Sequence, residues 1–288
     1  MLTTIFYHCD NFCNYFEDAA KECLISGQEI RPVKLGMPLA EIMTIMVYWS
    51  QSCFKTFKDF YEKGVLLHLK GEFPGALSYN RFLEIQKYAT LPLYIFAKIV
   101  SGECTGASFI DSTKLMVCNV KRITRHKTFK NLAKIGKTSM GWFFGFKLHI
   151  VVNQYREIVD FTLTAGNVDD RNHSVIDALI KKLKGLLFGD KGYIGLFDYL
   201  YDKGIKIVHG IRSNMKPKLM PLNERLLLNK RSSTVETAIG VLKSHLHLEH
   251  TRHRSPANFF CHLFSCLISY AFYIRRECLE RPLLSVTI

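Results

Sequence analysis

Two aspartates occur in sequence contexts that suit the binding of a divalent cation. Asp111 interrupts an apolar segment, residues 108–117, that is predicted to be a strand, and an unpaired carboxylate is costly in such a segment. Asp190 directly follows the apolar run 186–188 and Gly189, where it could simply start a turn. Hard cations such as Mg²⁺ select carboxylate oxygens and keep several waters. A few acids of this kind would therefore support metal-assisted hydrolysis of a phosphate ester.

Glu236 is a third candidate, and its sequence context is the least specific. It lies in a segment predicted to be helical, with Ser233 or Thr234 as the N-cap. An acid in the first turn of a helix is common because it interacts favourably with the helix dipole. Spacing alone therefore favours an ordinary helix acid, and a role in chemistry needs further support.

The elements that would position these acids follow an α/β order. Strands are predicted at 108–117, 142–152, 157–163, 186–188 and 205–211, and helices at 174–183, 196–203 and from 233 onward. Asp169 or Asp170 is expected to cap the first of these helices. Three antiparallel strands followed by right-handed helical crossovers resemble the ribonuclease H-like fold. Ligands bind outside the carboxyl ends of strands in such sheets, so Asp111, Asp190 and Glu236 are expected to converge.

Residues 1–107 are predicted to form a separate, all-helical N-terminal domain. Helical spacing of apolar residues is found in 12–23, 39–63 and 79–100, and Pro92 is expected to break or bend the last segment. Residues 108–288 would then form the α/β catalytic domain together with C-terminal helices.

The charge is distributed unevenly along the chain. Residues 1–107 carry 10 basic and 11 acidic side chains, whereas the remainder accounts for the entire net charge of +14. No acid occurs between Asp111 and Glu157, a stretch that includes Arg122, Arg125, Lys134 and Lys137. A basic run can be an ordinary solvated face, but clustering beside isolated carboxylates favours contacts with a phosphate backbone. A composition of 48% hydrophobic and 22% charged residues excludes a disordered or fibrous chain.

The cysteines and one long apolar segment indicate in which cellular compartment the protein is expected. The chain has nine cysteines, an odd number, without a CxxC motif or a basic leader, so we expect a reducing cytoplasm and no structural zinc. Residues 255–274 carry no formal charge and are long enough to span a bilayer. Polar residues interrupt this segment, which favours a buried core helix over a membrane anchor.

Five sequence blocks, in order, resemble the DDE transposases of bacterial insertion sequences, most closely the insertion-sequence group numbered 982. The blocks are Phe109-Ile-Asp-Ser-Thr113, Gly141-Trp-Phe-Phe-Gly-Phe-Lys-Leu-His149, Thr164-Ala-Gly-Asn-Val-Asp169, Gly189-Asp-Lys-Gly-Tyr193 and Glu236-Thr-Ala-Ile-Gly-Val-Leu-Lys243. The resemblance implies that Asp111, Asp190 and Glu236 are the catalytic, metal-binding acids. Related families carry Tyr and Arg before the glutamate, where this chain has Asn229 and Ser232, so no role is transferred to those two.

The resemblance also implies that residues 1–107 bind DNA ends and that Lys243 contacts DNA. Lys243 follows Glu236 by seven residues, about two turns of a regular α-helix, so both are expected on one side of the helix. The residues expected to contact DNA are Arg122, Arg125, Lys134, Lys137, Lys243, Arg252 and Arg254.

The function that the resemblance implies is DNA transposition. The enzyme would bind the inverted-repeat ends of its element, cut them with two Mg²⁺ or Mn²⁺ ions, and join the 3′-hydroxyls to target DNA. Double-stranded DNA is the expected partner, a homo-oligomer is expected on DNA, and no membrane is involved. Two alternatives remain open, namely a nuclease of the same fold without strand transfer and a catalytically inactive, transposase-derived DNA-binding protein.

Overall fold

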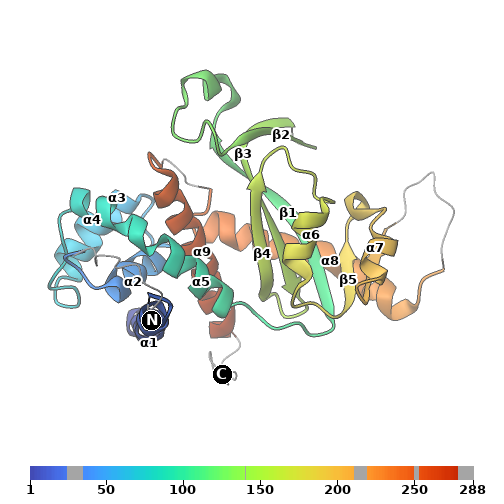
Figure 1. Ribbon diagram of the computed structural model, residues 1–288, viewed down its shortest axis with the longest axis horizontal. Coiled ribbons are helices and arrows are strands. Elements are labelled where there is room, and N and C mark those ends of the chain that lie inside the picture. The colour runs from blue at the N-terminus through green and yellow to red at the C-terminus, as the bar shows by residue number, and fades with distance from the viewer. Residues whose placement is uncertain (25–34, 140, 211–218, 250–252, 278–288) are drawn as a thin grey trace. The chain divides into compact units, whose positions relative to one another are not determined.

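The structure is a computed structural model in which residues 1–24, 35–139, 141–210, 219–249 and 253–277 are described (Figure 1). These residues divide into two compact units. Unit 1 contains the described residues of Met1–Val100 and Ser244–Tyr273, and unit 2 contains those of Ser101–Lys243 and 274–277. The C-terminal helix thus belongs mainly to the same unit as the first hundred residues, and not to the predicted domain of residues 108–288.

The described part of unit 1 is helical. Its elements are α1 (Leu2–Leu24), α2 (Leu39–Trp49), α3 (Phe57–Asp59), the π-helix η1 (Phe60–His68), α4 (Tyr79–Ile85), the 3-10 helix η2 (Gln86–Ala89), α5 (Thr90–Ile99) and most of α9 (Pro256–Glu277). The predicted single helix over 39–63 is wrong, because α2 ends at Trp49. The predicted break at Pro92 is also wrong. Pro92 lies in the first turn of α5, where its missing N–H costs no helical hydrogen bond, and the irregular turn is η2.

The apolar segment near the C-terminus is α9, and its side chains contribute to the core of unit 1. Pro256–Arg275 is long and apolar enough to cross a membrane by composition, but 67% of its most apolar stretch is buried inside the protein. Cys266, for example, donates from its thiol to the Leu246 carbonyl and contacts the Ser50 hydroxyl. These contacts are those of a core helix, as predicted.

Unit 2 is built on one six-stranded mixed sheet. Its strands are β1 (Ala107–Cys118), β2 (Lys134–Thr138), β3 (Gly141–Asn153), β4 (Ile158–Ala165), β5 (Gly185–Gly189) and β6 (Ile205–His209). The order is β2-β3-β1-β5-β6, and β4 also pairs with β3. β3 pairs antiparallel with both β1 and β4. β5 pairs parallel with β1, and β6 pairs parallel with β5. The predicted mixed α/β fold is therefore confirmed.

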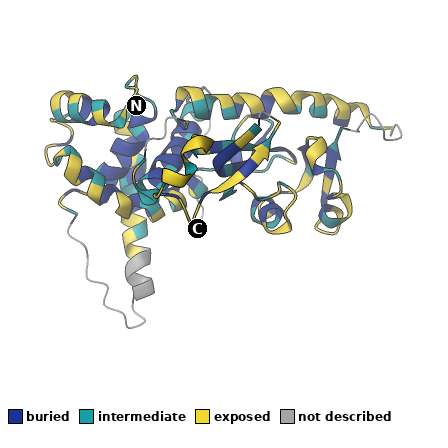
Figure 2. Cartoon of the chain, turned by 90° about the horizontal axis from the view of Figure 1, so that it is seen from above, coloured by how far each residue is buried: buried dark blue, intermediate teal, exposed yellow. Residues whose placement is uncertain are grey.

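Helices pack on this sheet and connect its strands (Figure 1). They are the 3-10 helix η3 (Val120–Arg125), α6 (His173–Ile180), the 3-10 helix η4 (Lys191–Tyr193), α7 (Phe197–Tyr201), α8 (Leu222–Gly240) and the π-helical continuation η5 (Val241–His245). The longer helices each have one buried and one exposed face (Figure 2). Such helices are stabilised mainly by packing of their apolar face.

Three local predictions in unit 2 are corrected by the structure. β2 was not predicted, and α8 begins at Leu222 rather than near residue 233. Ser233 and Thr234 do not cap a helix; they lie inside α8, and both hydroxyls donate to the Lys230 carbonyl. The cap of α6 is Asn172, whose side chain accepts from the Ser174 N–H, and not Asp169 or Asp170.

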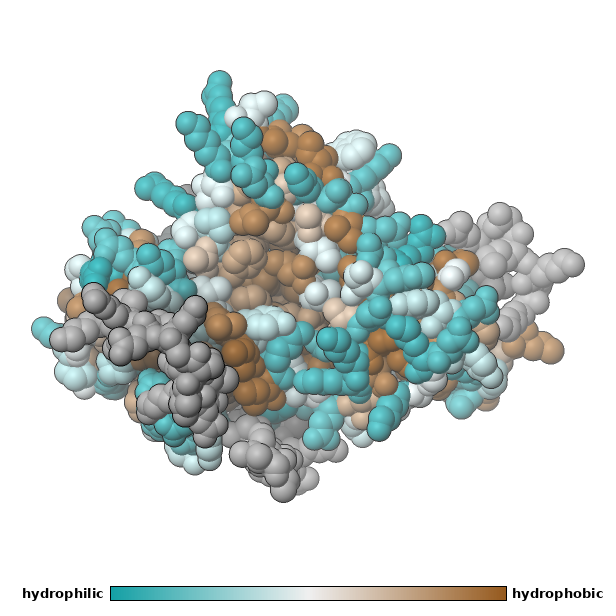
Figure 3. All heavy atoms as spheres, viewed as in Figure 1, coloured by the Kyte–Doolittle hydropathy of each residue, from teal (hydrophilic) through white to brown (hydrophobic). Residues whose placement is uncertain are grey.

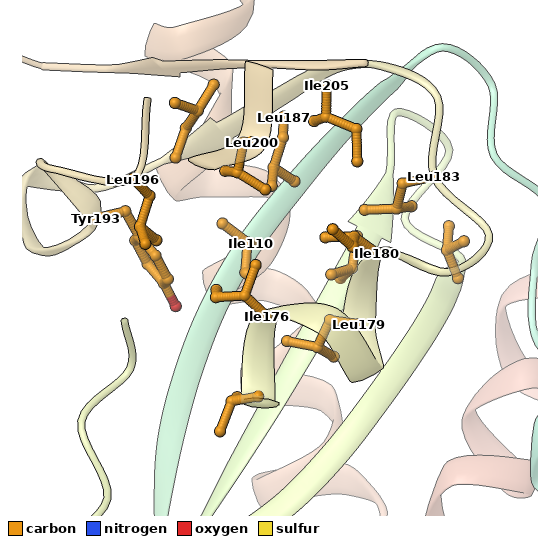
Figure 4. Close-up of a cluster of buried hydrophobic side chains, with 14 residues drawn as sticks. Ile110, Ile176, Leu179, Ile180, Leu183, Leu187, Tyr193, Leu196, Leu200 and Ile205 are labelled. Atoms are coloured by element: carbon orange, nitrogen blue, oxygen red, sulfur yellow. The ribbon is translucent and has the colours of Figure 1, made fainter. Parts of the chain in front are cut away.

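A cluster of aliphatic side chains fixes α6 and α7 to the sheet (Figure 4). Ile110 of β1 and Leu187 of β5 meet Ile176 and Leu179 of α6, and all four are buried. Because strand residues alternate between faces, the neighbours of Ile110 along β1 point to the opposite side of the sheet. This alternation determines the direction of Asp111.

We expect Ile176→Ala to lower the free energy of unfolding by about 2–5 kcal/mol, because it removes buried methyl groups and leaves a cavity beneath α6. Chemical denaturation of the purified protein measures this change. Lys181→Ala, at the exposed end of the same helix, is the control and should change stability by less than about 0.5 kcal/mol. Equal effects of the two substitutions would contradict the packing described for this cluster.

Candidate active site

The pairing of β1 with β5 places Asp111 and Asp190 at the same level of the sheet. Phe109 and Phe188 are register partners in this parallel pair, and their ring centroids lie 5.5 Å apart. Asp111 follows Phe109 by two residues, and Asp190 follows Phe188 by two residues. Side chains two residues apart in extended backbone point to the same face, so both acids follow the phenylalanine pair on one face. Asp190 also starts a turn, because its Oδ1 accepts from the Gly192 N–H at 2.8 Å.

Asp111 is held by a backbone amide and by an arginine from α8. Its Oδ1 accepts from the Ser112 N–H at 2.8 Å, and its Oδ2 lies 3.7 Å from Arg231 Nη1. The same guanidinium nitrogen donates to the Ile110 carbonyl at 3.3 Å. The Asp111 side chain is 26% exposed, so one side of the carboxylate remains open to a ligand.

Burial dominates the electrostatics of Asp111. It raises the pKa of this carboxyl from 3.8 to about 6, against the opposing effect of the Arg231 guanidinium. The negative charges of Asp190 and Asp170 raise it further. A carboxylate that is poorly solvated and close to other negative charges is stabilised by a bound cation. The surroundings of Asp111 therefore favour binding of a positive ion.

A second group of polar side chains lies on β3 and the loop after β4, and the pairing of His149 with Ser112 puts it on the other face of the sheet from Asp111. Lys147 Nζ donates to Asp170 Oδ1 at 3.1 Å and to the Val168 carbonyl at 2.8 Å. His149 Nδ1 lies 3.6 Å from the same Asp170 oxygen. Burial lowers the pKa of His149 to about 4, so the imidazole is neutral at neutral pH. Asp170, which we predicted as a cap of α6, instead contributes negative charge to the site.

Tyr193 contributes a buried hydroxyl to the same region. The side chain is fully buried, and its hydroxyl has no hydrogen-bond partner among the described residues. Burial raises its pKa well above the usual value, and the charges of Asp170, Asp111 and Asp190 raise it further. Tyr193 is itself part of the aliphatic cluster, and its ring lies at the edge of that cluster (Figure 4). A buried hydroxyl without a hydrogen-bond partner can donate to a ligand bound close to these acids.

Glu236 lies on α8 and is exposed to solvent. Arg231 of the same helix reaches Asp111, but in the described part of the chain no three His, Cys, Asp or Glu side chains lie close enough to hold a metal ion. Mg²⁺ commonly uses only one or two carboxylates and takes its other ligands from water and substrate phosphate. Asp111 and Asp190 supply two such carboxylates, and a place for Glu236 beside them stays a prediction.

Lys243 lies in η5, where the helix changes from α to π geometry. Its expected alignment with Glu236 assumed a regular α-helix through both positions. The i to i+5 hydrogen bonding of a π-helix changes the angular spacing, so that alignment no longer follows. Contact of Lys243 with DNA stays a prediction.

The basic segment between β1 and β3 forms an arm that projects from the sheet (Figure 1). We call residues 119–142 the basic arm. Arg122 and Arg125 lie on η3 and Lys134 and Lys137 on β2, and all four are exposed. Phe129 is buried and anchors the arm, with its ring centroid 5.9 Å from that of Phe146.

Strand alternation separates two of the predicted DNA contacts. Lys134 and Lys137 are three residues apart on β2, so they lie on opposite faces of the hairpin. Arg254 is exposed and belongs to unit 1, whereas Arg252 lies outside the described residues.

Binding of Mn²⁺ is expected to depend on pH through Asp111. A cation competes with the proton for this carboxylate, so affinity should fall about tenfold per pH unit below about pH 6 and level off above it. The pKa of Asp111 in the folded state is raised above 3.8, so the folded state binds this proton more tightly than the unfolded state. In the metal-free protein, the contribution of Asp111 to the free energy of unfolding is therefore present at low pH and is lost as pH rises through about 6. Isothermal titration with Mn²⁺ between pH 5 and 8 tests this, and Asp111→Asn should remove the step near pH 6.

Comparison with known proteins is consistent with this geometry. Residues 101–256, more than half of the chain, match the family described as "Transposase DDE domain". No curated protein matches the sequence significantly.

Proposed function

The chain belongs to the transposase DDE domain family, and from this membership we propose that it is a DNA transposase of a bacterial insertion sequence, closest to the group numbered 982. The main support for this proposal is that Asp111 and Asp190 lie at the same level of the neighbouring parallel strands β1 and β5. A ribonuclease H-like arrangement of the sheet belongs to the same proposal, in which unit 1 binds DNA ends and unit 2 carries the catalytic site.

We propose that Asp111 and Asp190, with Glu236 from α8, hold two Mg²⁺ or Mn²⁺ ions. Such ions, when bound, activate an attacking oxygen and stabilise the leaving oxygen of a phosphodiester. Arg231 offsets the buried charge of Asp111 and keeps the carboxylate oriented through the Ile110 carbonyl. Lys147 offsets the charge of Asp170 in the same way.

The basic arm supplies the second requirement, which is attraction of the DNA backbone. Arg122, Arg125, Lys134 and Lys137 are exposed in a segment without any acid, so they add a positive surface to the unit that carries the acids. Lys243, Arg252 and Arg254 are included in the proposed DNA-binding set. Phosphate contacts of this kind provide affinity and register and do not read sequence.

The proposed reaction has two stages. Hydrolysis at the inverted-repeat end releases a 3′-hydroxyl, and this hydroxyl then attacks a phosphodiester of target DNA. Two ends must be held together for joining, so we infer a homo-oligomer on DNA. We propose that the protein is cytoplasmic and associates with the nucleoid when bound to DNA.

The test is cleavage of a labelled duplex that carries the inverted repeat of the element, with Mg²⁺ or Mn²⁺ against a chelator. We expect metal-dependent cuts at the repeat end and joined products when target DNA is added. Cuts without joined products would favour the nuclease of the same fold. Tight binding without cleavage under any metal would overturn the proposal in favour of an inactive DNA-binding protein.

A further inference from the structure

The basic arm carries an exposed tryptophan close to its tip. The chain has two tryptophans. Trp49 is 3% exposed in the core of unit 1, whereas Trp142 is 62% exposed at the start of β3. A single exposed aromatic side chain needs no explanation by itself, so the residues around Trp142 decide what it can bind.

Trp142 shares one face of the β2–β3 hairpin with a cation and a second apolar side chain. Lys137 is its register partner, and Lys137 Nζ lies 5.4 Å from the centre of the tryptophan ring. Ile135, two residues from Lys137, lies on the same face and is also exposed. In the space-filling view the surface of the arm is mainly hydrophilic and includes an apolar patch (Figure 3).

The hairpin position of Trp142 is fixed by close backbone packing. A Cβ added at Gly136 would lie 2.1 Å from the Gly166 carbonyl oxygen, and one added at Gly145 would lie 2.0 Å from the Leu115 carbonyl oxygen. Only glycine permits these approaches, so the base of the hairpin is held tightly against its neighbours. Ring stacking loses less entropy when the ring is presented by an ordered strand.

An exposed aromatic ring beside a lysine matches the chemistry of a nucleotide. The ring offers a face for base stacking, and the ammonium offers a partner for the adjacent phosphate. In an intact duplex each base face is covered by its neighbours, so a protein ring can stack only on a base that has left the stack. Such bases occur at an opened or cut DNA end, which is the substrate of the proposed function.

We propose that Trp142 is a stacking platform for an unpaired nucleobase at the DNA end, with Lys137 as the partner of its phosphate. This inference rests on the proposed function and assigns to the arm a role beyond charge attraction. The stack orders the unpaired strand next to the hairpin and is independent of base identity, because every base has a π face.

The test uses tryptophan fluorescence of the full chain in chelator, so that no cleavage occurs. One DNA ligand is a duplex with a short unpaired overhang, and the other is a duplex of the same length closed at both ends by non-nucleotide linkers, so that it has no unpaired bases. We expect the overhang to quench the emission of wild type and to leave Trp142→Phe nearly unquenched, because Trp49 is buried. The closed duplex should quench neither protein.

Affinity provides a second readout, measured by anisotropy of labelled DNA. Trp142→Ala should weaken binding of the overhang DNA by about 5- to 150-fold, the usual range for loss of one stacked base, and leave closed-duplex binding unchanged. Tyr201→Ala removes another exposed aromatic ring of the same unit and should change neither affinity. Both substitutions are at exposed positions, and thermal unfolding checks that each variant is folded.

The outcomes separate the two proposals. Tight binding of both DNAs with unchanged Trp142 emission would overturn the stacking role and leave the transposase proposal intact. Equal quenching by the closed duplex would also overturn it, because that DNA has no free base face. Absence of binding to either DNA would overturn both proposals.

Discussion

Asp190→Asn is expected to abolish metal-dependent DNA cleavage, lowering the rate by about 10³-fold or more, while DNA affinity stays within about twofold. Loss of a group that stabilises transition-state charge typically costs about 10²–10³ in rate, and loss of a metal ligand removes the ion's contribution as well. Asparagine keeps an oxygen that can accept from the Gly192 N–H, so the turn should persist. Single-turnover cleavage and anisotropy of labelled DNA measure the two effects.

The matched control for this substitution is Asp198→Asn, an exposed aspartate on α7. It changes the net charge by the same amount and should leave both cleavage and binding unchanged. Asp111→Asn and Glu236→Gln are expected to behave like Asp190→Asn. Normal cleavage by Asp190→Asn would remove the metal-binding role proposed for the acid pair.

Replacing Arg122, Arg125, Lys134 and Lys137 together with glutamine is expected to weaken DNA binding irrespective of sequence and to flatten its dependence on salt. Each lost phosphate contact reduces the slope of log affinity against log salt by about 0.9, so four contacts correspond to a change of about 3–4. Binding titrations at several salt concentrations measure this slope. The side chains are exposed, so the fold should be retained.

The opposite faces of β2 allow the same experiment to be refined. Lys134→Gln and Lys137→Gln each remove one charge but from different faces of the hairpin. If DNA lies along one face, only one of the two substitutions changes the slope by about one unit. Lys181→Gln, on an exposed lysine of the same unit, is the control, and a quadruple variant with an unchanged slope would refute the proposed contacts.

The sheet was predictable where strand patterns are strong. β1, β3 and β4 alternate or run apolar over many residues, and β5 and β6 are short buried runs between glycines. β2 was missed because its residues, Lys134 to Thr138, are mostly polar or glycine, and its pairing with β3 is a tertiary effect. The start of α8 was not predicted because its first three turns contain several polar and charged residues, a composition typical of a loop.

The candidate site was predictable only in part, for the same reason. Asp111 and Asp190 stand out because each occurs within or after an apolar strand, and the parallel register brings them together. Arg231, Lys147 and Tyr193 have no distinctive local pattern; their role follows from contacts between distant segments. Asp170 was assigned to a cap because sequence cannot show that a lysine on β3 reaches its carboxylate.

The parallel pairing of β1 with β5 also has a consequence for the order of folding. β3 and β4 are joined by a short turn, and β3 reaches β1 and β2 through contacts that are fairly local in sequence. Asp111 and Asp190, by contrast, are about 80 residues apart, and closing such a loop costs entropy before any contact is gained. The antiparallel half of the sheet, with its arm, can therefore form first. We therefore expect the acid pair to be completed only after the antiparallel half of the sheet has formed.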